Sequence, residues 1–335
     1  MSIPEMKVKK LMALAKQFAD IKLWEHIDSD ALFALNNRAD KQISYISVMG
    51  NLGEVFGLAV YHGEKGRLAY EKLIDLSNSG SEIDHFDIPF IQDALTIYFS
   101  SWNEADAADL RMIKQSGVVF SNKKMLPIFR THTPGLYNWK IDEKEVEILI
   151  SVLEDILELT EILKSRKHNL YNAGKYILFA KTENQWLSKE ILVTKSPSVK
   201  TEPVKLESKS IPFALANKTM SGVWEMHYFY SNMPIRNKSE RPFYGVICMI
   251  VDSTAGFIVS HAVIGSFDQT EKQLSEILSG VIENGKIIPK EILYARTEIG
   301  IALEKTANDL GIVLRKTNNL PCIEDVIDSM NSKML

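Results

Sequence analysis

The sequence has few cysteines and no long apolar run. Its two cysteines, Cys248 and Cys322, are too few for a disulfide framework or a four-cysteine zinc site. We expect both to be small buried side chains in a reducing compartment. The longest apolar run, near residues 246–251, is far shorter than the roughly 20 residues of a membrane span. The first residues also lack a signal-peptide core. These absences predict a cytoplasmic protein that does not insert into membranes.

The sequence also has no excess of positive charge. It carries 39 Lys and Arg against 43 Asp and Glu, which gives a net charge of -4 over 335 residues. A protein that coats nucleic acid generally needs a basic surplus, so that class is excluded, although a local basic patch is not. The content of hydrophobic residues, 45%, is that of an ordinary globular protein. The length suggests two domains.

The first 170 residues alternate helical and strand patterns and predict an α+β domain. The clearest helix covers residues 143–167, where apolar residues recur at spacings of three and four. Asp142 followed by Glu145 has the pattern of a capping box at its start. A second helix is expected over residues 104–115, with Asn103 as its N-cap. Residues 171–210 are predicted to be a connecting hairpin and a linker, because residues 194–210 are rich in Lys, Ser, Pro and Thr.

The pattern of helices and strands is clearer in residues 211–335. Three strands are expected over residues 223–231, 243–251 and 257–264, and alternating helices and strands follow them. The predicted order is strand, strand, strand, helix, strand, helix, strand, helix. The whole chain is therefore expected to be a mixed α/β protein, with an N-terminal α+β domain and a C-terminal domain that begins with antiparallel strands.

The C-terminal order resembles the ribonuclease H-like fold of integrases and transposases. Trp224 stands where that family has a Trp-x-x-Asp strand, Asp252 lies in the hairpin turn, and Glu324 lies on the last helix. Active members hold magnesium with carboxylates, because this hard cation prefers oxygen ligands. The first carboxylate position corresponds to His227, and the second to Ala295 or Arg296. The resemblance thus implies a relative that has lost its metal site, with no metal and no cofactor.

Three carboxylates of this part remain weak catalytic candidates, namely Asp252, Glu324 and Glu225. Asp252 corresponds to a turn residue in the family, so a hydrogen bond to the turn explains it more simply than a catalytic role. Arg296 is a candidate binding residue. At a magnesium site its cation would repel the ion. The alternative is an enzyme that acts on nucleic acid through these carboxylates.

The whole chain also resembles an uncharacterised bacterial family with two tandem domains of unknown function. The stretches that carry this resemblance are residues 47–61, 130–139 and 241–244. The family implies the two-domain organisation and no activity.

The most site-like stretch of the N-terminal domain is residues 130–139. Arg130, His132, Tyr137 and Trp139 place a guanidinium, an imidazole and two aromatic rings on one predicted loop, which could grip a phosphate or a planar ligand. The alternative is a loop packed over the domain, with Arg130 in an ion pair.

Three functions follow from these patterns. The first is a non-catalytic binding protein, whose partner is a protein or a nucleic acid recognised by the C-terminal domain. The second is a metal-dependent enzyme that processes nucleic acid. The third is a sensor that binds a small ligand through residues 130–139. We favour the first, because the family's carboxylates are missing.

Overall fold

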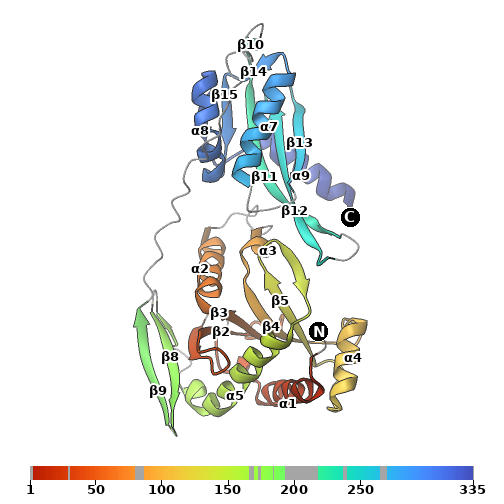
Figure 1. The fold of residues 1–335 in the computed structure, drawn as a ribbon, viewed down its shortest axis with the longest axis vertical. Helices are drawn as coiled ribbons and strands as arrows, with labels where there is room; N and C mark the ends of the chain where they lie inside the picture. The colour runs from red at the N-terminus through yellow and green to blue at the C-terminus, as the bar shows by residue number, and fades with distance from the viewer. Residues whose placement is uncertain are drawn as a thin grey trace. The chain divides into compact units, whose positions relative to one another are not determined.

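The computed structural model of the chain describes residues 3–28, 31–79, 87–165, 170–172, 175–183, 185–192, 218–236, 240–264 and 270–334. The chain divides into two compact units, Met1–Ser196 and Pro197–Leu335, whose helices and strands are drawn in Figure 1. Within the described residues, no helix is long and apolar enough to cross a membrane.

The first unit is a mostly antiparallel sheet with helices on both faces. Its sheet order is β6-β5-β4-β3-β2-β1-β8-β9, and β7 pairs with the start of β8. Only β1 and β8 run parallel among these neighbours. The strands are β1 Leu32–Asn36, β2 Ile43–Met49, β3 Phe56–His62, β4 Ala94–Ser100, β5 Leu126–Thr133, β6 Leu136–Trp139, β7 Tyr171–Asn172, β8 Lys175–Thr182 and β9 Gln185–Leu192. The helices are α1 Glu5–Ile21, η1 Leu23–Glu25, α2 Gly63–Ser79, α3 Ile88–Ile91, α4 Ala107–Ser116 and α5 Glu143–Ser165.

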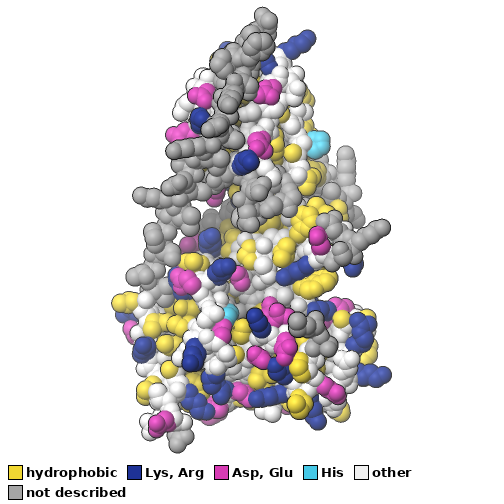
Figure 2. Space-filling model, in the orientation of Figure 1, with side chains coloured by type: hydrophobic (Ala, Val, Ile, Leu, Met, Phe, Trp, Pro, Cys, Tyr) yellow, Lys and Arg dark blue, Asp and Glu magenta, His cyan; other side chains and the backbone are white. Residues whose placement is uncertain are grey.

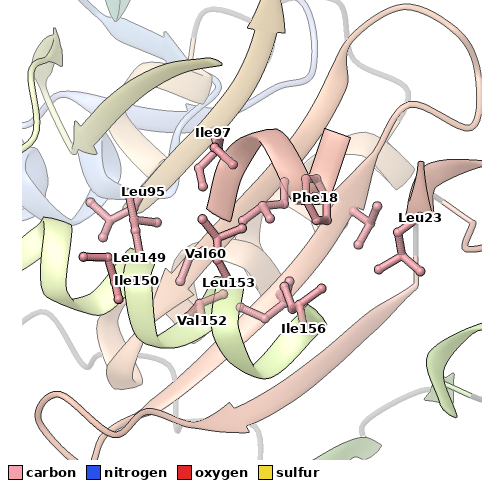
Figure 3. Packing of buried hydrophobic residues seen from close by; sticks show 14 of the residues in the cluster. Phe18, Leu23, Val60, Leu95, Ile97, Leu149, Ile150, Val152, Leu153 and Ile156 are labelled. Atoms are coloured by element: carbon pink, nitrogen blue, oxygen red, sulfur yellow. The ribbon is translucent and has the colours of Figure 1, made fainter. Parts of the chain in front are cut away.

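The main core of this unit lies between the sheet and the helices α1 and α5. Figure 3 shows Leu149, Leu153 and Ile156 of α5 directed at Val60 and Leu95 of the strands. The predicted capping box is present, since Glu145 N–H donates to Asp142 Oδ1 at 2.9 Å and Asp142 N–H donates to Glu145 Oε2 at 2.7 Å. Sequence patterning and capping therefore place α5 as expected.

The hairpin β8–β9 belongs to the sheet of the first unit. β8 extends the sheet by parallel pairing with β1, with Phe33 opposite Ile177. This differs from its expected place in a connecting segment, and local sequence could not reveal it because the pairing joins residues far apart along the chain. The predicted linker, residues 194–210, lies outside the described residues.

The second unit has the predicted succession of elements. Its sheet order is β13-β12-β11-β15-β16; β11, β12 and β13 pair antiparallel, whereas β15 and β16 are parallel to β11. The strands are β10 Thr219–Met220, β11 Val223–Ile235, β12 Phe243–Asp252, β13 Phe257–Ile264, β14 Ile287–Ile288, β15 Glu291–Tyr294 and β16 Val313–Lys316. The helices are α7 Thr270–Asn284, α8 Thr297–Leu310 and α9 Pro321–Met334. β10 and β14 form a separate two-stranded ladder.

The helix α9 covers one face of β11 and β12. Phe229, Met249 and Val251 from these strands form an apolar cluster with Ile323 of α9. Because side chains alternate along a strand, Glu225 and His227 lie on the same face as Phe229. This face carries two of the residues that the sequence resemblance singles out, Glu225 and His227.

Candidate functional site

The candidate site of the second unit is built from β11, the end of β15 and the start of α9. Ala295, just after β15, packs against the apolar cluster that contains Phe229 and residues of α9. Of the two residues considered for the second carboxylate position, Ala295 is therefore the one on the face of His227. A methyl group stands there, which cannot bind a metal ion.

His227 is buried in this face without a hydrogen-bond partner. Its side chain belongs to a residue that is 4% exposed, and neither Nδ1 nor Nε2 has a partner among the described residues. Burial, aided by the positive charge of Arg296, lowers the pKa of His227 to about 3. The imidazole is therefore neutral at physiological pH and fills space in the apolar cluster.

Arg296 lies against the opposite face of β11. Its Cζ is 4.6 Å from the ring centre of Tyr228 and 5.7 Å from that of Tyr230, and these tyrosines alternate with His227 and Phe229 along the strand. Its Nε donates to the carbonyl oxygen of Tyr228 at 3.1 Å. This contact ties the start of α8 to β11, and the binding role of Arg296 stays a prediction.

The carboxylate of Glu225 holds the start of α9. Glu225 is 1% exposed, and its Oε2 accepts a hydrogen bond from the backbone N–H of Ile323 at 3.0 Å. A carboxylate at a helix N-terminus is stabilised by the unpaired N–H groups and by the helix dipole. Burial and the neighbouring Glu225 raise the pKa of the Cys322 thiol, so this cysteine is not activated as a nucleophile.

The other two candidate carboxylates also bind the backbone. Asp252 accepts hydrogen bonds from the N–H groups of Thr254 and Ala255, at 2.9 and 3.0 Å, and from the indole of Trp224 at 3.3 Å. Glu324 accepts one from the N–H of Leu320 at 3.2 Å. Asp252 thus stabilises its turn, as the simpler interpretation predicts, and Glu324 caps its own helix.

These residues do not fit the two magnesium ions of the fold that the sequence resembles. Such ions need several oxygen ligands directed at one point. Here the three carboxylates are bonded to different backbone groups. The positions that the sequence resemblance assigns to carboxylates carry His227 and, on the same face, Ala295. In the part of the chain that the structure describes, no three His, Cys, Asp or Glu residues form a group that could hold a metal ion.

In the first unit, Arg130 is bound within the protein rather than presented to a ligand. It is 8% exposed, and its two terminal nitrogens donate to the two oxygens of Asp109 at 2.7 and 2.6 Å. A further contact of 3.3 Å joins it to Asp106. The paired geometry is the strongest form of an arginine–carboxylate bond, so Arg130 fixes α4 to β5.

Lys140 completes this ion cluster, and sequence patterns did not indicate its role. Its ammonium group bonds Asp106 and, at 2.8 Å, Oδ1 of Asp109. Burial would raise the pKa of Asp106, but the bonds from Lys140 and from the N–H groups of Asp109 and Ala108 hold it well below its usual range. The four charges balance, which stabilises the start of α4.

The other predicted residues of this stretch do not converge with Arg130. The imidazole of His132 lies 3.1 Å from Thr96 Oγ1 within the sheet. Tyr137 and Trp139 lie on β6 and are 37% and 39% exposed. The structure thus separates a buried cation from two exposed aromatic rings.

The first unit also contains a Ser–His–Asp chain of hydrogen bonds that the sequence patterns did not indicate. His62 Nδ1 lies 2.8 Å from Ser44 Oγ, and Nε2 lies 2.7 Å from Asp40 Oδ2. Ser44 is 0% exposed and also accepts a bond from Asn37 Nδ2 at 3.2 Å. A nucleophile must reach its substrate, so this chain ties β2 to β3 and is not a hydrolytic triad.

Comparison with known protein families identifies both units. Residues 9–181, more than half of the chain, match the family described as Domain of unknown function (DUF7309). The chain therefore belongs to this family. Residues 214–331 match a second domain of unknown function, DUF6930. No curated protein matches the chain.

A solved structure with partial similarity is the catalytic core domain of BIV integrase. The two sequences are 16% identical, and the match covers 33% of this chain and 65% of that chain, with a TM-score of 0.25. The chain thus spans less than two thirds of that core domain.

Proposed function

We propose that this chain is a non-catalytic binding protein whose second unit is a ribonuclease H-like domain without its metal site. The order of elements supports the fold assignment, because three antiparallel strands precede two parallel strands reached through helices. The observation that carries the proposal is the pair His227 and Ala295, a neutral imidazole and a methyl group in an apolar cluster.

The bonding of the remaining carboxylates supports loss of catalysis. To bind a metal ion, Glu225 would have to release the N–H of Ile323, and Asp252 would have to release three donors. A buried donor left without a partner costs about 1–3 kcal/mol. The alternative of an active nuclease would require several such losses at once.

The surface of β13 favours a protein partner over nucleic acid. Phe257, Ile258 and Val263 are 53%, 44% and 61% exposed, and the strand carries no charged residue. Among the described residues, β13 pairs only with β12. On the face drawn in Figure 2, positive and negative side chains are interspersed over the first unit, without one large area of Lys and Arg.

The proposal is tested by restoring the carboxylates. The double substitution His227→Asp with Ala295→Asp places two acids on the face of β11 that α9 covers. We expect a melting temperature that rises with Mn²⁺ concentration, because ligand binding to the native state stabilises it. The matched control, His227→Asp with Arg296→Asp, puts the second acid on the opposite face and should show no such rise.

Two results would contradict the proposal. In the first, Mn²⁺ stabilises the control variant as much as the test variant. Ala295 would then not be the residue that corresponds to the second carboxylate. The other is Mg²⁺- or Mn²⁺-dependent cleavage of DNA or RNA by the natural sequence, lost on Glu225→Gln. That outcome would establish the nuclease instead.

A further inference from the structure

Two exposed apolar side chains lie at the end of the first unit where β4 ends and residues 117–125 lead from α4 to β5. Trp102 is 48% exposed and Val119 is 75% exposed. Val118 and Phe120, on either side of Val119, pack against the main core and so anchor this loop. The backbone N–H of Trp102 donates to the carbonyl oxygen of Lys123 at 2.9 Å, which ties Trp102 to the same loop. The exposed side chains are therefore held in place by the fold.

Three lysines adjoin these side chains. The ammonium group of Lys123 lies 6.0 Å from the ring centre of Trp102, and that of Lys16 on α1 donates to the carbonyl oxygen of Val119 at 2.8 Å. Lys124 is the exposed neighbour of Lys123. Among the described residues, none of the three lysines forms an ion pair. We call these five residues the Trp102 surface.

The charge of the Trp102 surface is positive, although the chain as a whole carries a net charge of -4. Two acids lie near it in the sequence, Asp20 and Glu104, and in the described part of the chain neither pairs with its lysines. Lys7, in contrast, is neutralised by Glu143 and Glu147. The Trp102 surface therefore combines exposed apolar side chains with positive charge that the protein itself does not balance.

This combination is complementary to a bilayer surface that contains anionic lipid. Indole rings favour the headgroup region, because one end is apolar and the other is polar. Lysines beside the ring are attracted by the negative potential of the lipid, and the aliphatic side chain of Val119 can enter the apolar boundary. Single-stranded nucleic acid would need the face of Trp102 for base stacking, and Lys123 already lies over that ring.

We propose that the Trp102 surface attaches this chain reversibly to membranes that carry anionic lipid. Such contact lies in the plane of the bilayer surface and involves no crossing helix. Each lysine near an anionic surface strengthens binding about five-fold, so three together contribute about 100-fold. The inference goes beyond the proposed function, because it concerns the first unit and depends neither on the carboxylates nor on the partner of the second.

Binding is measured by flotation of the full chain with vesicles of phosphatidylcholine, alone or with about 30% phosphatidylserine. We expect partition into the vesicles with phosphatidylserine to be about 100-fold stronger at low salt. Most of this advantage should disappear at about 1 M salt, because the screening length then falls to about 3 Å.

The apolar contribution is tested with Val119→Asp. This substitution places a negative charge at the bilayer boundary and should weaken partition by about ten-fold or more. Because Val119 is 75% exposed, the variant should fold normally. The matched control is Leu192→Asp on β9, where the natural side chain is 77% exposed, and it should leave partition unchanged.

The contribution of the lysines is tested with the double substitution Lys123→Glu and Lys124→Glu. It changes the local charge by four units and should weaken partition into the anionic vesicles by about 100-fold or more. The control, Lys144→Glu with Lys189→Glu, makes the same change in net charge at two other exposed positions of the first unit. This control should keep most of the binding.

Four outcomes would overturn the proposal. No partition at millimolar phosphatidylserine removes the site, and equal partition into phosphatidylcholine alone removes the role of the lysines. An equal loss of partition in Leu192→Asp and Val119→Asp places the contact elsewhere. Vesicles that fail to bind, while a single-stranded oligonucleotide binds through Lys123 and Lys124, would assign the surface to nucleic acid.

Discussion

The unpartnered imidazole of His227 makes the second unit sensitive to acid. The folded state holds the pKa of His227 at about 3 through burial and the charge of Arg296, whereas an unfolded chain has a histidine pKa near 6.5. Between these two values the unfolded state binds more protons, so stability rises with pH. The stability that neutral His227 contributes to the second unit is fully present above about pH 6.5 and is lost as the pH falls toward 3.

The size of the effect follows from this shift. Each pH unit within the window changes the free energy of unfolding by about 1.36 kcal/mol, so His227 should lower stability by about 2 kcal/mol at pH 5 relative to pH 7. The substitution His227→Leu removes the titration. It also removes two buried polar atoms without partners, which should add about 1–3 kcal/mol of stability at every pH.

The assay is urea unfolding at pH 7 and pH 5, followed by ¹⁹F NMR of protein labelled with 5-fluorotryptophan. Trp224 is the only tryptophan after residue 196, so its resonance reports the second unit alone. The quantity compared is the change in unfolding free energy between the two pH values. His261→Gln, at an exposed position of β13, is the control. The reasoning fails if His227→Leu keeps the full pH dependence, or if the variant is less stable at pH 7.

Three further predictions concern buried charges. Burial raises the pKa of Asp155 to about 6, against the opposing charge of Arg38. The native state therefore binds more protons than the unfolded state, and stability falls as the pH rises from about 4 to 6. Asp155→Asn should stabilise the first unit by about 1–3 kcal/mol at pH 7, as measured by denaturant unfolding. Arg130→Met should destabilise the same unit by about 3–5 kcal/mol, because it leaves the buried Asp109 poorly paired, and Asp109→Leu in the same chain should recover much of the loss. Asp252→Ala should destabilise the second unit by about 2–4 kcal/mol through loss of its three hydrogen bonds, whereas Asp252→Asn, which keeps an acceptor for the turn, should lose less.

Elements with strong local patterns could be predicted from the sequence. The strand at residues 257–264 has the predicted bounds, and α5 starts at its predicted capping box. The helix expected from residue 104 starts instead at Ala107, with Asp106 as its N-cap. The side chains of Asp106 and Asp109 accept hydrogen bonds from each other's backbone N–H groups. The carboxylate of Glu104 accepts a hydrogen bond from the N–H of Ser101 at 3.2 Å. A capping box usually has Glu or Gln at its fourth position, so the aspartate at that position hides this one in the sequence.

The candidate sites required information that the sequence does not carry locally. The pairing of Arg130 with Asp109 spans 21 residues, and the contact of Lys140 with Asp109 spans 31. Each partner is individually unremarkable in sequence, because any surface lysine or aspartate has the same local surroundings. The ion cluster depends on α4 meeting β5, which only the tertiary structure specifies.

The end of β15 shows how one residue of register decides which face of the sheet a side chain joins. Ala295 and Arg296 are neighbours after β15, and the sequence resemblance left open which of them corresponds to the second carboxylate of integrases. Since side chains alternate between the faces of a sheet, a shift of one residue moves a group to the other side. Ala295 packs with the cluster at α9, whereas Arg296 stacks on Tyr228. The face that α9 covers is therefore filled by apolar packing around His227. Burial, aided by the charge of Arg296 across the sheet, keeps that histidine neutral.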